Sequence, residues 1–287
     1  MKKIKNYNYL QIRKINYKDR IKSSKKFDPP IDINNWMTNP YTWFKSIFYI
    51  EISSIIVFVS HHLKISPNFL TGIYILLGLV GGLFLSINNN SIIVIGLIIF
   101  FSRGSFDWSD GVLARLTGQT SNLGNLLDNW GAKVGSISFT IGFGFYLHNI
   151  HNEFLIVYLI LFIKFLKLID LRDYSYHLAT FELIKIKNKK KYLEKINLKR
   201  SKLFRKKGFN FYIFFKNIFL NFVDERSRTI DLILGLIYLD IFYFNIYILK
   251  YIFYYMAFKT LIVFLAGIYA VIFKNYVFRE NNKILNK

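Results

Sequence analysis

The sequence predicts an all-α integral membrane protein: a bundle of six transmembrane helices preceded by an amphipathic helix in the membrane interface. Of its 287 residues, 53% are hydrophobic, yet the formal net charge is +22. The mean hydropathy of +0.29 is too high for an ordinary soluble domain. Apolar helices joined by basic loops explain both properties, because Lys and Arg gather in the cytoplasmic loops of membrane proteins.

Composition also narrows the classes of function. The chain has no cysteine, which excludes disulfides and thiolate metal sites. A nucleic-acid-binding protein could be this basic, but it would not need so many apolar runs. We therefore expect anionic membrane lipids or a phosphate-bearing substrate, and no nucleic acid, as partners. The basic N-terminal stretch lacks the apolar core of a signal peptide.

The region before the first predicted span divides into two parts. Residues 1–35 are polar and basic, and we expect a partly disordered cytoplasmic arm. Residues 36–64 are mostly apolar but are interrupted by Lys45 and Glu51, a pattern that suits an interfacial helix. The membrane domain is then expected over residues 65–275, with a short polar tail over 276–287.

Six apolar runs predict the spans, since about 20 apolar residues cross a hydrocarbon core of about 30 Å. The first is preceded by Pro67, which suits the first turn of a helix. The runs cover residues 69–87, 91 to beyond 106, 123–147, 154–171, 229–248 and 250–274. A basic insertion over residues 172–228, with 16 Lys or Arg against five Asp or Glu, separates the fourth run from the fifth.

The distribution of basic residues predicts the topology. Residues 1–26 and 172–228 are strongly basic and are therefore expected in the cytoplasm. Four spans lie between them, an even number, so residues 36–64 must not cross the membrane. Both termini and the turn at residues 116–123 are then cytoplasmic.

Charged residues interrupt the second and third spans, where ionisable side chains are costly and usually functional. On the second helix, positions 107, 110, 111 and 114 recur at i, i+3, i+4 and i+7, and so share one face. Carboxylates placed this close repel one another, and Mg²⁺ or Mn²⁺ would relieve the repulsion while bridging to substrate phosphates. The set comprises Asp107, Asp110, Gly111, Ala114, Arg115, Gly124 and Asp128.

The spacing Asp107-x2-Asp110-Gly111-x2-Ala114-Arg115-x8-Gly124-x3-Asp128 resembles the signature of the CDP-alcohol phosphatidyltransferase family, class I. The resemblance extends over residues 43–275, and the segment at 116–124 is similar to bacterial members. It implies a six-span fold, often a homodimer, in a bacterial inner membrane with a cytoplasmic active site. The implied reaction transfers a phosphoalcohol group from a CDP-linked alcohol donor to an alcohol or phosphorylated-alcohol acceptor, and releases CMP.

The resemblance also assigns roles. Asp107, Asp110 and Asp128 would be the catalytic residues and would ligate Mg²⁺ or Mn²⁺. The CDP pocket would be lined by Gly111, Ala114, Arg115 and Gly124.

One position departs from the family pattern. The family has a fourth Asp four residues after the third, as the proposed base and a ligand of a second metal, and this chain has Ala132 there. Alanine can neither accept a proton nor hold a metal. Loss of a positioned base costs about 10²–10⁴-fold in rate. Asp128 or a charged residue elsewhere could take over the role.

Two alternatives to an active transferase remain. One is a catalytically impaired CDP-alcohol-binding paralogue or scaffold, which Ala132 would explain. The other is a polyol or ion transporter that uses the acidic cluster. Two roles also remain for three basic residues, each of which could anchor a span at the interface or bind an acceptor phosphate: Lys164, Arg226 and Arg228.

Overall fold

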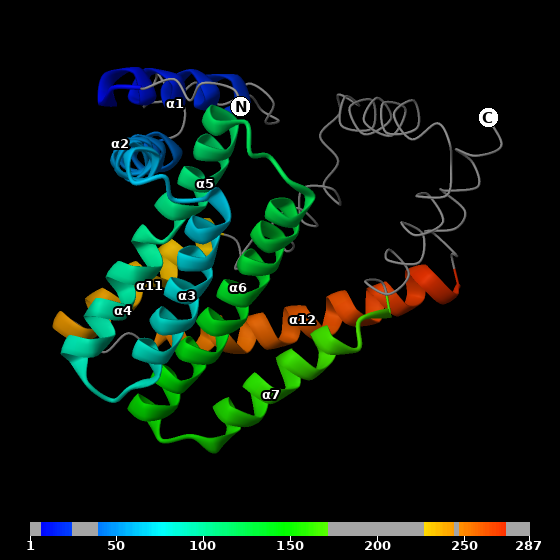
Figure 1. The fold of residues 1–287 in the computed structure, drawn as a ribbon. Coiled ribbons are helices and arrows are strands. Elements are labelled where there is room, and N and C mark those ends of the chain that lie inside the picture. The colour runs from blue at the N-terminus through cyan, green and yellow to red at the C-terminus, as the bar shows by residue number, and fades with distance from the viewer. Residues whose placement is uncertain (1–6, 25–39, 172–226, 244–246, 274–287) are drawn as a thin grey trace. The chain divides into compact units, whose positions relative to one another are not determined.

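The computed structural model describes residues 7–24, 40–171, 227–243 and 247–273 (Figure 1). All secondary structure in these ranges is α-helical, as the sequence predicts. The chain divides into two compact units, Met1–His151 with Leu234–Phe244, and Asn152–Ile233 with Asn245–Lys287. Most of the basic insertion, Arg226 and the tail at 276–287 lie outside the described residues.

The first unit contains the helices that matter for function. These are α1 (Tyr9–Ser24), α2 (Pro40–His62), α3 (Pro67–Ser86), α4 (Asn90–Ser102), α5 (Gly104–Thr117) and α6 (Asn122–His151). The C-terminal half of α11 (Ser227–Phe242) also belongs to it.

The second unit holds α7 (Phe154–Leu168), α12 (Ile248–Ile272) and the N-terminal half of α11. Within it, Glu153 forms an ion pair with Lys250 and accepts a hydrogen bond from the hydroxyl of Tyr254 at 2.9 Å. Lys164 lies on α7, and its Nζ is buried.

Local sequence explains where the helices of the first unit begin and end. Pro67 occupies the first turn of α3, and the Ser66 side chain accepts a hydrogen bond from the backbone N–H of Phe69. Asn89 caps α4 in the same way. Gly118, with φ of 70°, ends α5 in the left-handed conformation that glycine adopts most readily.

Four described helical stretches are long and apolar enough to cross a membrane, as a helical integral membrane protein requires. The other three predicted spans fall short: α6 has 30 residues but is less apolar, while α7 and α11 have 15 and 16. The six-span count therefore stays a prediction. The four stretches are Trp43–His62, Pro67–Ser86, Asn90–Thr117 and Ile248–Ile272.

The first two helices lie across one end of the bundle. Figure 1 shows α1 beyond the end of α5, and α2 nearly end-on while α3, α5 and α6 are seen from the side. An interfacial helix would have this orientation if α3 spans the bilayer, but α2 is itself apolar enough to span, so its interfacial placement remains a prediction. The predicted arm is more ordered than expected, since residues 9–24 form a helix.

Helices α3 and α6 lie side by side at a very short distance. A Cβ atom at Gly82 would come within 2.6 Å of the Ser138 carbonyl oxygen, and one at Gly142 within 2.5 Å of the Gly82 carbonyl oxygen. Small residues at an interface between membrane helices allow this close backbone approach. Glycine on both helices therefore sets the separation of the two elements that carry much of the candidate site.

The glycine contact predicts a stability difference between two alanine substitutions. Gly142→Ala should destabilise the protein by about 1–3 kcal/mol, because the new methyl group would overlap backbone rather than a movable side chain. Gly72→Ala, on the exposed face of α3 with no atom within 4 Å of the added Cβ, is the matched control. Thermal unfolding in detergent would measure both, and equal melting temperatures would contradict the proposed packing.

Candidate active site

A cavity of about 590 Å³ opens between α1, α3, α5 and α6. Its lining includes all seven residues of the sequence signature, which the fold brings together from two helices. They are Asp107, Asp110, Gly111, Ala114, Arg115, Gly124 and Asp128.

The spacing on α5 explains how that helix contributes five of the seven. Residues 107, 110, 111, 114 and 115 recur at helical spacing and so lie along one stripe of α5. The chain turns at Gly118, and α6 then returns alongside with Gly124 and Asp128 on the same cavity. The predicted single helix through residue 103 is interrupted there, since α4 ends at Ser102 and α5 starts at Gly104.

The three carboxylates have different surroundings. Asp110 is half-buried and accepts a hydrogen bond of 2.5 Å from the Thr71 hydroxyl on α3. Asp107 is also half-buried and close enough to Asp128 for their side chains to interact. Asp128 itself is exposed. A hydrogen bond to a charged oxygen orients a carboxylate, so Thr71 is a positioning residue for Asp110.

The three carboxylates are suitable ligands for a hard divalent cation, but they do not form a complete coordination sphere. Carboxylate oxygens are the ligands that Mg²⁺ and Mn²⁺ prefer. Within the described ranges, however, no three His, Cys, Asp or Glu side chains are grouped closely enough to hold a metal alone. Further ligands such as phosphate oxygens and water would have to complete the coordination, as is usual for Mg²⁺.

Ala132 lies on α6 one helical turn after Asp128, which lines the cavity. Ala132 itself is exposed and is not among the lining residues. The preceding residue, Gly131, is buried against α3, where a Cβ atom would meet Tyr74 and Ile75 at 2.8 Å.

The contribution of α1 to the cavity was not predicted from the sequence. Asn16, Asp19 and Arg20 line the same cavity, and Asp19 accepts a hydrogen bond of 2.9 Å from Nε of Arg115. Residues 1–35 contain many charged and polar side chains, so nothing in the composition marked these three as part of a site. Only their helical spacing from Ile12, at i+4, i+7 and i+8, marks one face.

Arg103, four residues before Asp107 at the junction of α4 and α5, was not predicted to belong to the site either. Its guanidinium lies 4.6 Å from the Tyr74 ring centroid, and Nη2 donates to the Tyr74 hydroxyl at 2.9 Å. Nη1 is buried and has no hydrogen-bond partner among the described residues. Glycines make the space, because a Cβ at Gly78 or Gly135 would overlap Nη1 at 2.4 and 1.7 Å. Its charge within an apolar run of the sequence could have indicated a functional role, because charged residues inside a span are usually functional.

Arg103 lies close to the carboxylates without lining the cavity. It shares a face of the helix with Asp107 and interacts with it electrostatically. A fixed positive charge at this place offsets part of the repulsion between the carboxylates. Arg103 is therefore a charge-balancing residue beneath the acidic cluster.

The contact between Arg103 and Tyr74 can be tested by stability. Tyr74→Phe should lower the free energy of unfolding by about 1–3 kcal/mol, because a second guanidinium nitrogen would lose its acceptor in a buried place. Tyr158→Phe, at a residue 68% exposed on α7, is the control and should change little. Chemical or thermal unfolding of both variants in the same detergent would decide, and equal losses would argue against the Arg103 contact.

Comparison with known proteins agrees with the signature. The family model for CDP-alcohol phosphatidyltransferase matches residues 64–199, a stretch that includes α3 to α7 and all seven signature residues. No curated protein and no solved structure matches the chain. The resemblance recognised from the signature is thus confirmed over residues 64–199, where the chain matches the CDP-alcohol phosphatidyltransferase model.

Proposed function

We propose that the protein transfers a phosphoalcohol group from a CDP-alcohol donor to an alcohol acceptor and releases CMP, in the synthesis of phospholipids or related polyol phosphates. The observation that carries the proposal is the convergence of all seven signature residues on one cavity. The family supports this reaction class, and a cavity of about 590 Å³ is within the size range of small-molecule sites.

The donor would be held at the diphosphate. Asp107, Asp110 and Asp128 would bind Mg²⁺ or Mn²⁺, which neutralises the diphosphate and stabilises the leaving CMP when bound. Gly111, Ala114 and Gly124 are small and would let the nucleotide approach the helix backbone. Arg115 presents a guanidinium fork that suits phosphate oxygens.

The bond changes in the reaction are simple. The acceptor hydroxyl oxygen forms a bond to the phosphorus that carries the donor alcohol, and the bond from that phosphorus to the CMP oxygen breaks. The hydroxyl proton needs a base, and Ala132 cannot serve. Asp128 is the candidate we favour, because it is exposed, lines the cavity and lies one helical turn before Ala132.

The membrane location, topology and assembly of the protein are also part of the proposal. We place both termini and the cavity on the cytoplasmic side of a bacterial inner membrane, with membrane lipids around the bundle and a homodimer as the assembly. The basic α1 at the cavity supports this side, since cytoplasmic segments of membrane proteins are enriched in Lys and Arg.

Removal of one carboxylate should abolish the reaction. Asp110→Asn keeps the size of the side chain but loses the negative charge, so CMP release from a panel of CDP-linked donors should fall by at least about 10³-fold. Asp170→Asn, outside the cavity, should leave the rate unchanged. Wild-type protein that is folded and releases no CMP from any donor and acceptor pair would exclude the proposed reaction.

Restoring the family carboxylate should raise the rate. Ala132→Asp would place a carboxylate on the same face of α6 as Asp128, one turn further along, beside the cavity that Asp128 lines. We expect it to increase CMP release by about ten-fold or more, because a positioned base contributes about 10²–10⁴-fold and Asp128 would replace it only in part. Ala132→Asn is the control with similar size and no charge.

The same pair of variants separates the alternatives. CDP-alcohol binding without turnover in the wild type, with turnover appearing only in Ala132→Asp, would favour the impaired paralogue. Metal-dependent nucleotide binding in either form would count against a transporter.

A further inference from the structure

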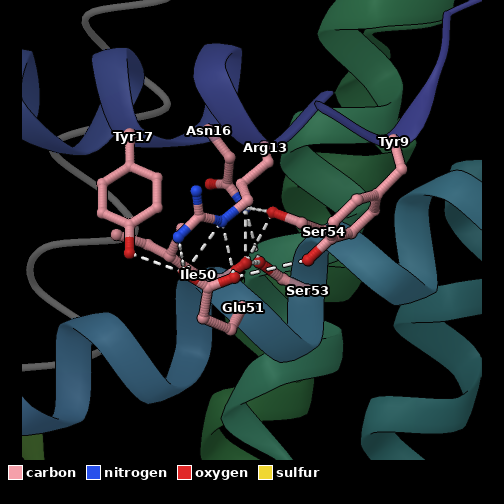
Figure 2. A network of polar contacts seen from close by, with 8 residues as sticks. All are labelled: Tyr9, Arg13, Asn16, Tyr17, Ile50, Glu51, Ser53 and Ser54. Atoms are coloured by element: carbon pink, nitrogen blue, oxygen red, sulfur yellow. Dashed lines mark hydrogen bonds and ion pairs between the residues drawn. The ribbon is translucent and has the colours of Figure 1, made fainter. Parts of the chain in front are cut away.

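Helix α1 is anchored on α2 through one carboxylate (Figure 2). Glu51 accepts hydrogen bonds from Nε of Arg13 at 2.8 and 2.9 Å, and its Oε1 lies 2.5 Å from Nη2. The hydroxyls of Tyr17 and Tyr9 donate to the same carboxylate at 2.7 and 3.3 Å. Three side chains of α1 thus converge on the acidic residue that interrupts the apolar run of α2.

A second contact, next to the first, is buried. The amide of Asn16 donates to the Ser53 and Ser54 hydroxyls at 2.6 and 3.1 Å, and to the Ile50 carbonyl at 3.3 Å (Figure 2). Ile12 is fully buried in a core cluster. Its partners there are Val57, Leu70, Val112 and Leu113. Both polar and apolar contacts therefore fix α1 in the unit that contains the cavity.

The docked helix brings charged groups to the cavity. The Arg20 guanidinium lies 4.3 Å from the Trp108 ring centroid and donates to the Ser46 hydroxyl at 3.1 and 3.3 Å. Asp19 forms an ion pair with Arg115, but the two side chains are 39% and 54% exposed. Exposed ion pairs contribute little to the free energy of folding. The contacts of Glu51 and Asn16, rather than that pair, therefore place α1.

Arg20 has the properties of an oxyanion-binding side chain. Its stacking on Trp108 and its bonds to Ser46 orient the guanidinium plane before any ligand arrives. Burial lowers the pKa of Arg20, yet a guanidinium stays charged at neutral pH. Arg20 lines the cavity that holds the signature residues, and a guanidinium fork matches phosphate or carboxylate geometry.

We propose that α1 is a wall of the substrate site, in which Arg20 binds an oxyanion of the substrate and Glu51 positions the helix. The oxyanion is either the donor diphosphate or a phosphate or carboxylate on the acceptor. The proposal rests on the proposed function for the identity of the substrate. It goes beyond the signature because none of its residues belongs to the family motif.

Arg20→Gln tests the binding role in the full-length protein. We expect the Kd for CDP by calorimetry, or the KM for the donor or acceptor, to rise about ten-fold or more, as one charge-assisted hydrogen bond implies. The value of kcat should change less. Arg20→Lys should recover only part of the loss, and Lys14→Gln, at an exposed residue of α1, should change neither constant by more than about two-fold.

The pattern of the losses identifies the oxyanion. A weaker CDP affinity assigns Arg20 to the donor, and a higher KM for the acceptor alone assigns it to the acceptor. Unchanged CDP affinity together with unchanged KM values would overturn the proposal. If the wild type releases no CMP, the proposed reaction fails, and the CDP affinity of Arg20→Gln alone decides the role of Arg20.

Limited trypsin digestion tests the anchor without any assay of activity. Glu51→Gln should speed cleavage after Lys14 and Lys18, read by mass spectrometry, and should raise the same binding constant as Arg20→Gln. The exchange of charges in Arg13→Glu with Glu51→Arg should restore protection. Digestion of Glu51→Gln at the wild-type rate would show that Glu51 does not hold α1, and faster cleavage with unchanged binding would show that α1 is not part of the site.

Discussion

The close approach of α3 and α6 is the constraint on which the candidate site depends. Gly82 and Gly142 let the two backbones come within contact distance, and any larger residue there would move α6 away. Helix α3 also packs against α5 and supplies Thr71 to Asp110. The position of α3 therefore sets how far Asp128 on α6 lies from the carboxylates of α5.

The same packing explains how an arginine can lie beneath three carboxylates. Gly78 on α3 and Gly135 on α6 leave the volume that the Arg103 guanidinium fills. A buried cation without a carboxylate nearby would be costly in an apolar bundle, as would a group of carboxylates without a cation. The acidic cluster and Arg103 each lower the cost of the other.

What could be predicted from the sequence was the part encoded locally. Helical periodicity placed four signature residues of α5 on one face, and Pro67 and Gly118 mark helix boundaries through their own backbone preferences. The contribution of α1 could not be predicted, because it depends on pairs such as Asn16 with Ser53, 37 residues apart in the chain. Periodicity within one helix does not say which other helix will meet it. The sequence shows that Glu51 is a charged residue in an apolar run, but it does not show which residues contact Glu51.

Ala132 on α6 and the residues of α1 differ in how they relate to the cavity. On α6, Asp128 lines the cavity and Ala132 does not. Helix α1, which lies outside the motif, brings Asp19 and Arg20 to the same cavity through its contacts with Glu51 on α2. Asp19 meets Arg115 near the end of α5, whereas Asp107 lies eight residues, or about 12 Å along a helix, away from Arg115. Helix α1 is therefore too far from Asp107 to supply a base there. Under the proposed function, Ala132 would affect turnover, whereas the residues of α1 would affect substrate binding.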